Sequence, residues 1–181
     1  MSNSLRFIKQ VNATSSVNEI SLTDVFTTDY DIYKITIAFN EYDGGTNDVV
    51  DMRIRFINSS GSKITASNYS SARMTMKSEA TKDEDKFTNL SYAYGVVLGG
   101  DYNSGGGVLY IYNPTNPNVY TFTSGQGASG YETTAGHKFR STNQIGVLEQ
   151  TNNIAGINFH SPSASNDFKA DVRVYGIRDS L

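Results

Sequence analysis

The sequence predicts an all-β protein, an antiparallel two-sheet β-sandwich with a jelly-roll-like arrangement. Residue types that favour strands are abundant, including 12 Tyr and 9 Phe among 181 residues. Short blocks of alternating apolar and polar residues recur between turn residues, which is typical of half-buried strands. No segment carries a sustained apolar stripe at helical spacing. About ten such blocks indicate two packed antiparallel sheets.

Two predicted strands carry the alternation most clearly. In Asp31–Phe39, every second residue from position 33 is apolar. In Asp48–Ile57 the apolar residues again occupy every second position, and Arg53 and Arg55 are predicted to point to solvent. Asn58–Gly61 follows as a tight turn. The other predicted strands are Leu5–Val11, Glu19–Val25, Arg73–Lys77, Ser91–Leu98, Val108–Asn113, Val119–Thr123, His137–Ser141, Gln144–Glu149, Ile154–His160 and Ala170–Ile177.

Two of the predicted segments, Tyr92–Leu98 and Val108–Tyr112, are apolar on both faces. Such strands lie centrally in a sandwich or bury their outer face against another chain. The charged stretch Ser78–Lys86 is instead predicted to be a solvated loop or a single helical turn. No break in composition divides the chain, so we predict a single domain over residues 1–181.

Composition and charge exclude several function classes. The formal net charge of −3 argues against nucleic acid as the main partner, because nucleic-acid binding needs concentrated positive charge. The absence of cysteine excludes a disulfide framework, a thiolate metal site and a cysteine nucleophile. The first residues lack the pattern of a secretory signal, and no segment approaches the about 20 apolar residues of a membrane helix. We therefore expect a soluble protein without a membrane partner.

A glycine motif at Gly125–Gly130 matches the spacing of a dinucleotide-binding fingerprint, with Glu149 about twenty residues further on. That fingerprint needs a helix whose N-terminus binds the pyrophosphate. The residues that follow favour a strand instead. We therefore interpret the motif as a flexible glycine loop between strands and expect no cofactor.

The two histidines, His137 and His160, are the other candidates for chemistry. Together with a carboxylate such as Asp171 they have the residue types of a hydrolytic metal site. Both, however, fall at strand edges in the outward phase, where a solvated histidine needs no special role. No GxSxG motif places a nucleophilic serine, and no Trp is present to form a sugar platform beside paired carboxylates. We expect no catalytic residues and no metal ion, with a hydrolase as the least favoured alternative.

Two loops carry the remaining candidates. Asp43–Asp48 has oxygen ligands and glycines that a calcium ion would need, but it lacks the EF-hand spacing and is predicted to be a hairpin turn. The glycine-rich segment at 99–107 contains Asp101, Tyr102 and Asn103. These three residues are our candidates for contact with a partner protein or a glycan, because such loops are hydrogen-bonding and adaptable.

A series of segments along nearly the whole chain carries a family resemblance. They are Phe7–Lys9, Ser21–Phe26, Asp29–Ile35, Met52–Gly61, Ser67–Tyr69, Tyr112–Pro114, Ile154–Phe159 and Val172–Ile177. In this order they resemble small β-sandwich virion proteins of tailed bacteriophages, including phages of marine and cyanobacterial hosts. The resemblance implies capsid-decorating, tail-associated or fibre proteins, and it implies no catalytic residues.

These observations lead to one main functional hypothesis. We expect a non-enzymatic virion protein that decorates the capsid, is made in the bacterial host cytoplasm and binds the major capsid protein or other virion proteins. Strands that are apolar on both faces favour oligomerisation, and a homotrimer is the expected state. The alternative is a tail-fibre or appendage module that recognises a host surface glycan, for which the loops at 99–107 and 125–136 would converge.

Overall fold

The computed structural model describes residues 5–43, 51–78, 82–97, 105–133, 136–163 and 167–178. These residues form strands and turns and contain no helix. The large sheet has eight strands, in the order β1 (Leu5–Asn12), β12 (Asp167–Ile177), β3 (Ile32–Asp43), β8 (Gly105–Tyr112), β9 (Thr121–Thr133), β10 (Gly136–Leu148), β5 (Tyr69–Lys77) and β6 (Asp83–Leu90). The small sheet has four, in the order β2 (Glu19–Leu22), β11 (Ile154–His160), β4 (Asp51–Asn58) and β7 (Ala93–Val97).

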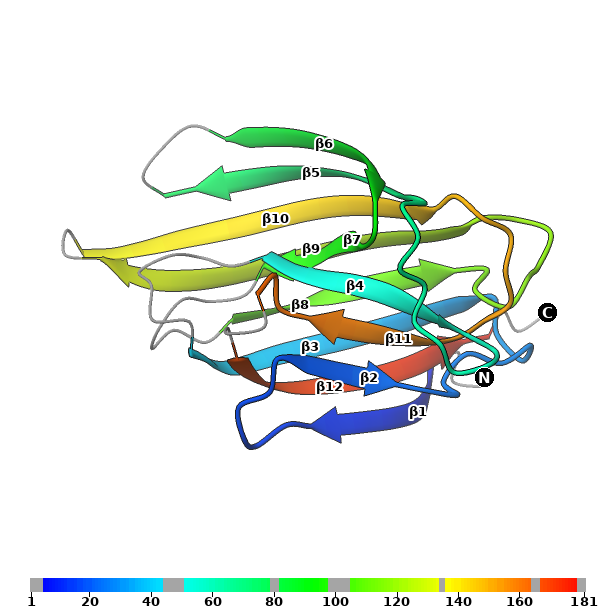
Figure 1. Cartoon of the computed structure of the whole chain (residues 1–181). Coiled ribbons are helices and arrows are strands. Elements are labelled where there is room, and N and C mark those ends of the chain that lie inside the picture. The colour runs from blue at the N-terminus through cyan, green and yellow to red at the C-terminus, as the bar shows by residue number, and fades with distance from the viewer. Residues whose placement is uncertain are drawn as a thin grey trace.

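The two sheets are antiparallel throughout and face each other, which confirms the predicted β-sandwich. In Figure 1 the small sheet lies in front of the large one, and β5 and β6 form one edge of the large sheet. The described residues include no helix long and apolar enough to cross a membrane.

The core lies between the sheets and follows the alternation in the sequence. The apolar residues of β3, β4 and β12 point inward, and their polar neighbours point outward. The largest fully buried side chains include Tyr33, Phe56, Tyr69, Phe159 and Phe168. Tyr69 keeps hydrogen-bond partners in the core: its hydroxyl donates to the Ile64 carbonyl at 3.1 Å and accepts from the Phe56 amide at 3.0 Å. Burial raises the pKa of Tyr69 to about 12.

The prediction of a solvated loop or helical turn at Ser78–Lys86 is wrong over its second half, because Asp83–Leu90 forms β6. This strand pairs with β5, and Arg73 forms an ion pair with Asp85 at 2.7 Å. The alternation in β6 is carried by charged residues, since Glu84 and Lys86 are exposed while Asp85 is half-buried. A pattern search based on apolar residues therefore misses it.

The predicted hairpin at Asp43–Asp48 is also wrong. The flanking strands β3 and β4 belong to different sheets, and a hairpin would require them to pair with each other. Residues 44–50, which contain most of the oxygen ligands considered for calcium, lie outside the described residues.

The glycine motif at Gly125–Gly130 is not a loop, because it lies within the long strand β9. Gly105–Gly107 likewise forms the first part of β8 and pairs with Gly127–Ser129. Close approach of the backbones explains these glycines: a Cβ at Gly107 would lie 2.3 Å from the Gln126 carbonyl oxygen. The two segments do lie side by side, but as paired strands and not as converging loops.

The two strands predicted to be apolar on both faces have different positions. β8 is central in the large sheet, between β3 and β9, as expected. β7 lies at an edge of the small sheet, which contradicts a central position. Its outward Tyr94 packs within the chain against Phe87, at 4.5 Å between ring centroids, and against Arg73, at 4.7 Å. The outward side of β7 therefore needs no second chain to cover it.

Candidate functional site

The strongest candidate site is the outer face of the large sheet, the face turned away from the small sheet. Its residues are set by strand register. Asn143 of β10 stands opposite Gln126 of β9 and Met74 of β5, and one step along, Ile145 stands opposite Ser124. Because side chains two residues apart share a face, these rows line one continuous surface.

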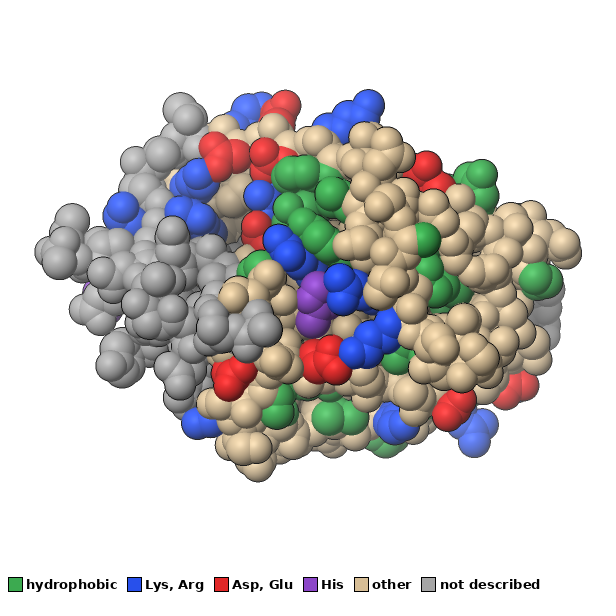
Figure 2. Space-filling model, in the orientation of Figure 1, with side chains coloured by type: hydrophobic (Ala, Val, Ile, Leu, Met, Phe, Trp, Pro, Cys, Tyr) green, Lys and Arg blue, Asp and Glu red, His purple; other side chains and the backbone are tan. Residues whose placement is uncertain are grey.

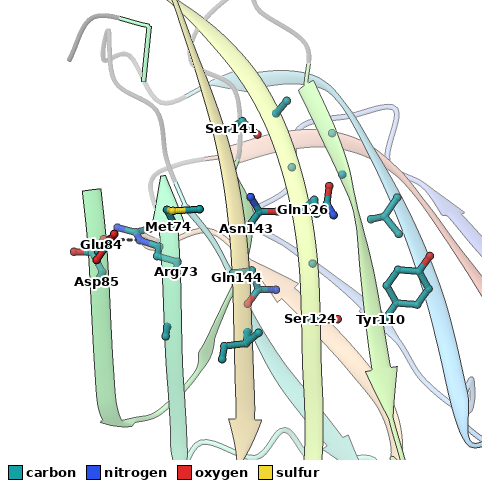
Figure 3. A pocket seen from close by; sticks show the side chains of 18 of the residues that line it. Arg73, Met74, Glu84, Asp85, Tyr110, Ser124, Gln126, Ser141, Asn143 and Gln144 are labelled. Carbon is teal, nitrogen blue, oxygen red and sulfur yellow. Dashed lines mark hydrogen bonds and ion pairs between the residues drawn. The ribbon is translucent and has the colours of Figure 1, made fainter. Parts of the chain in front are cut away.

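A groove of about 1100 Å³ crosses this face over β5, β10, β9 and β8. Small residues of β8 and β9, among them Gly106, Gly127 and Ala128, form its floor because they have little or no side chain. Longer side chains rise on both sides, with Met74 toward β5 and Tyr110 toward β8 (Figure 3), and Ile145 of β10 also lines the groove. The groove is therefore a direct result of small residues between two rows of large ones.

The β8 side of the groove carries hydrogen-bonding groups. The hydroxyls of Tyr112 and Ser124 are hydrogen-bonded at 2.9 Å, which holds the Tyr112 ring on the outer face. Gln126 and Asn143 place two amide groups side by side on neighbouring strands (Figure 3). Aromatic rings beside amides and hydroxyls provide both stacking and hydrogen-bonding contacts for a polar ligand.

Large apolar side chains are also exposed on the outer face, along β5, β10 and the start of β9. Five of them are exposed by 38–62% of their surface. We call them the apolar strip: Met74, Met76, Phe122, Phe139 and Ile145. Two smaller hollows, of about 560 and 210 Å³, lie beside Phe139 and beside Phe122 and lengthen the groove along the strip.

In β10 large apolar side chains face outward while polar ones face the core, which reverses the usual arrangement of a half-buried sheet. Ile145 and Phe139 are more than 60% exposed, whereas Thr142 and Gln144 on the opposite face are buried. Antiparallel sheets in water normally place their apolar phase on the core. Large apolar side chains grouped on a water-facing sheet are unusual for a soluble protein surface.

The site residues expected from the sequence are placed differently. Asp101, Tyr102 and Asn103 lie outside the described residues. The expectation of a solvated His160 is wrong, because this residue is only 8% exposed on the outer side of the small sheet. Asp171 lies on the outer face of the large sheet, where it accepts a hydrogen bond from Gln10 and pairs with Arg173, so the structure does not bring it to His160. The part of the chain that the structure describes contains no group of three metal-ligating residues.

The buried imidazole predicts a loss of stability in mild acid. Burial, followed by the charges of Arg55 and Arg53, holds the pKa of His160 below its ordinary value of 6.5. The unfolded chain therefore binds more protons than the folded one as the pH falls from about 6.5, and stability decreases through this window toward the lowered pKa. Urea unfolding at about pH 7.5 and pH 5.5 should show a larger loss for the wild type than for His160→Gln. Equal losses would contradict a buried neutral imidazole.

No protein-family model and no curated protein matches this chain. Among solved structures, the phototoxic fluorescent protein mKillerOrange is 9% identical at a TM-score of 0.29, over 65% of this chain and 62% of that one. Scytalido-glutamic peptidase, solved with a peptide-based transition state analog, is 12% identical at a TM-score of 0.25, and the match covers 87% of this chain and 65% of that one. A family 7 alginate lyase is 5% identical at a TM-score of 0.27, and the match covers 84% of this chain and 64% of that one. The chain thus spans just under two thirds of each of these structures, and similarity at this level supports no inference about activity.

Proposed function

We propose that the protein is a non-enzymatic structural protein that attaches to a larger protein assembly through the outer face of its large sheet. The observation that carries this proposal is the apolar strip, the large apolar side chains that β5, β9 and β10 leave exposed on the outer face. Exposed apolar surfaces of this kind mark protein interaction sites in soluble proteins. The assembly that we propose is a tailed-phage particle, with the capsid shell as the attachment surface, and the resemblance of the sequence to phage virion proteins supports this choice.

The arrangement of the strip supports a protein neighbour. Met74 and Met76 are flexible side chains that adapt to a partner surface, and Phe139 offers a large apolar contact area. Glu84 and Lys86, which are exposed on β6, give the strip a charged border. An apolar centre with a polar rim is the usual composition of a protein interface. The homotrimer stays a prediction. The outward side of β7 no longer supports oligomerisation, because residues of the same chain cover it.

Quantitative mass spectrometry of purified particles tests this proposal. We expect a copy number comparable with that of the major shell protein, because a decoration protein binds repeatedly across the capsid. A much lower copy number would indicate that the protein is located at the tail or at a vertex of the capsid. Absence of the chain from the particle would contradict the proposal.

Recognition of a host surface glycan is the second candidate, and the polar side of the groove favours it. Tyr110, Gln126 and Asn143 lie together on the outer face beside the hydrogen-bonded Tyr112 and Ser124. Binding on a glycan array that is lost in Asn143→Ala would favour this function, provided that Asn143→Ala unfolds at the wild-type temperature. No binding on the array would count against it.

A further inference from the structure

The outer side of the small sheet carries a second group of polar residues that the proposed attachment does not use. Strand register aligns them in two rows, Glu19–His160–Arg53 and Ser21–Asn158–Arg55. Figure 2 looks onto this side and shows basic side chains around a histidine, with acidic side chains nearby. Every residue of the two rows lies on β2, β11 or β4, so the rigid sheet fixes their relative positions.

Two guanidinium groups here have no carboxylate partner among the residues that the structure describes. Arg53 donates from Nη1 to the Pro162 carbonyl at 3.2 Å, and Arg55 donates from Nε to the Ser91 carbonyl at 3.1 Å. These carbonyls hold the side chains in place without neutralising them. Nearby acidic groups are already engaged: Glu19, for example, pairs with Lys63 at 2.6 Å. The two arginines therefore leave a local excess of positive charge on a chain whose net charge is −3.

Four buried polar atoms at the same place have no hydrogen-bond partner among the residues that the structure describes. They are His160 Nε2, Asn158 Oδ1, Arg53 Nε and Ser161 Oγ. His160 Nδ1 donates to the Ser161 carbonyl at 2.9 Å, which leaves Nε2 on the side of the ring away from that bond. Because buried polar groups are normally paired, a cluster of unpaired ones indicates that another molecule completes the site.

Tyr92 forms one wall of this group. Its ring lies 4.1 Å from the guanidinium carbon of Arg53 and meets the His160 ring edge-on at 6.1 Å between centroids. The ring therefore packs against both Arg53 and His160, and His160 is buried. Low exposure strengthens a charge interaction at this position.

We propose that Arg53, Arg55 and His160 form a binding site for a small oxyanion, a carboxylate, sulfate or phosphate group, on the outer side of the small sheet. Guanidinium groups donate paired hydrogen bonds to such oxygens, and the buried Arg53 Nε has no acceptor among the residues that the structure describes. Protonated His160 adds a donor from Nε2. Asn158 Oδ1 accepts from a hydroxyl or a water molecule that accompanies the anion.

The site links anion binding to protonation of His160. The charged groups that face this imidazole are Arg53 and Arg55 from β4 and Glu19 from β2, and Tyr92 faces it from the segment before β7. An anion bound between the two arginines offsets their charge and favours the imidazolium form. Affinity should therefore increase as the pH falls below about 6.5, and binding should raise the pKa of His160.

The two histidines allow a direct test by NMR. Sodium sulfate is titrated into the full chain at about pH 6 and constant ionic strength, with sodium chloride as the salt control and sodium acetate as a carboxylate probe. We expect saturable shifts of the His160 ring signals, while the exposed His137 serves as the internal reference. Arg55→Gln should weaken binding about tenfold or more, since one charged donor is lost. Arg173→Gln removes the same charge from the large sheet and should leave the affinity unchanged.

Several results would overturn the inference. Parallel shifts of both histidines, or shifts with chloride as large as those with sulfate, would mean a general salt effect. Equal affinities of wild type and Arg55→Gln would exclude the arginine site. If Arg55→Gln unfolds, Arg55→Lys keeps the charge without the paired donors, and it should bind more weakly than the wild type. Absence of any saturable shift would mean that the unpaired atoms hold water alone.

Discussion

Replacing Phe159 with alanine is expected to lower the free energy of unfolding by about 3–5 kcal/mol. The Phe159 side chain is fully buried on β11, opposite Ile54 of β4 and Ile20 of β2, so its loss leaves a cavity between the two sheets. Urea unfolding followed by tyrosine fluorescence measures the change.

Phe122→Ala is the matched control for this variant, because it removes the same side chain from an exposed position on the outer face. Its unfolding free energy should lie within about 0.5 kcal/mol of the wild type. A similar cost for both variants would contradict the assignment of Phe159 to the core and Phe122 to the surface.

If the protein attaches to a phage particle as proposed, aspartate at both Phe139 and Ile145 is expected to weaken its binding to particles that lack this protein by about 100-fold or more. Each side chain is exposed by more than 60%, so the substitutions leave the fold intact and place charge in an apolar contact. Truncation of a central interface residue costs about 2 kcal/mol or more, and about 1.4 kcal/mol changes affinity tenfold. Co-sedimentation of purified protein with the particles measures the affinity.

Val119→Asp provides the control for charge, because Val119 is also an exposed apolar residue but lies in the turn region between β8 and β9. We expect it to bind like the wild type. If the double variant also binds like the wild type, the apolar strip is not the attachment surface.

The fold class was predictable because the core follows simple alternation. Residues 33, 35, 37 and 39 of β3 and residues 52, 54 and 56 of β4 are both apolar in sequence and buried in the structure. The positive φ of Gly61, +81°, agrees with the turn predicted at Asn58–Gly61. Strand pairing was not predictable in the same way, since β3 and β4 are consecutive but belong to different sheets.

The candidate site could not be predicted, because alternation alone does not say which phase faces the core. In β10, Phe139 and Ile145 have the pattern of core residues, yet they face outward, while Gln144 is buried. Only the position of β7 behind this part of the sheet identifies the inner face: a Cβ at Gly146 would lie 3.2 Å from Ala93 of β7. The half-burial of Arg53 and Arg55, which were predicted to point to solvent, depends on Ser91 and Pro162, residues far from them in sequence.

Hydroxyl-radical footprinting of the free and particle-bound protein tests the attachment surface most directly. Met74 and Met76 of the apolar strip are exposed and readily oxidised, whereas Met52 is fully buried and serves as the unreactive reference. We predict that Met74, Met76 and Phe139 are oxidised in the free protein and protected on the particle, while Val119→Asp gives the same pattern as the wild type. Equal oxidation of Met74 and Met76 in both states would show that the outer face of the large sheet is not the surface through which this protein attaches.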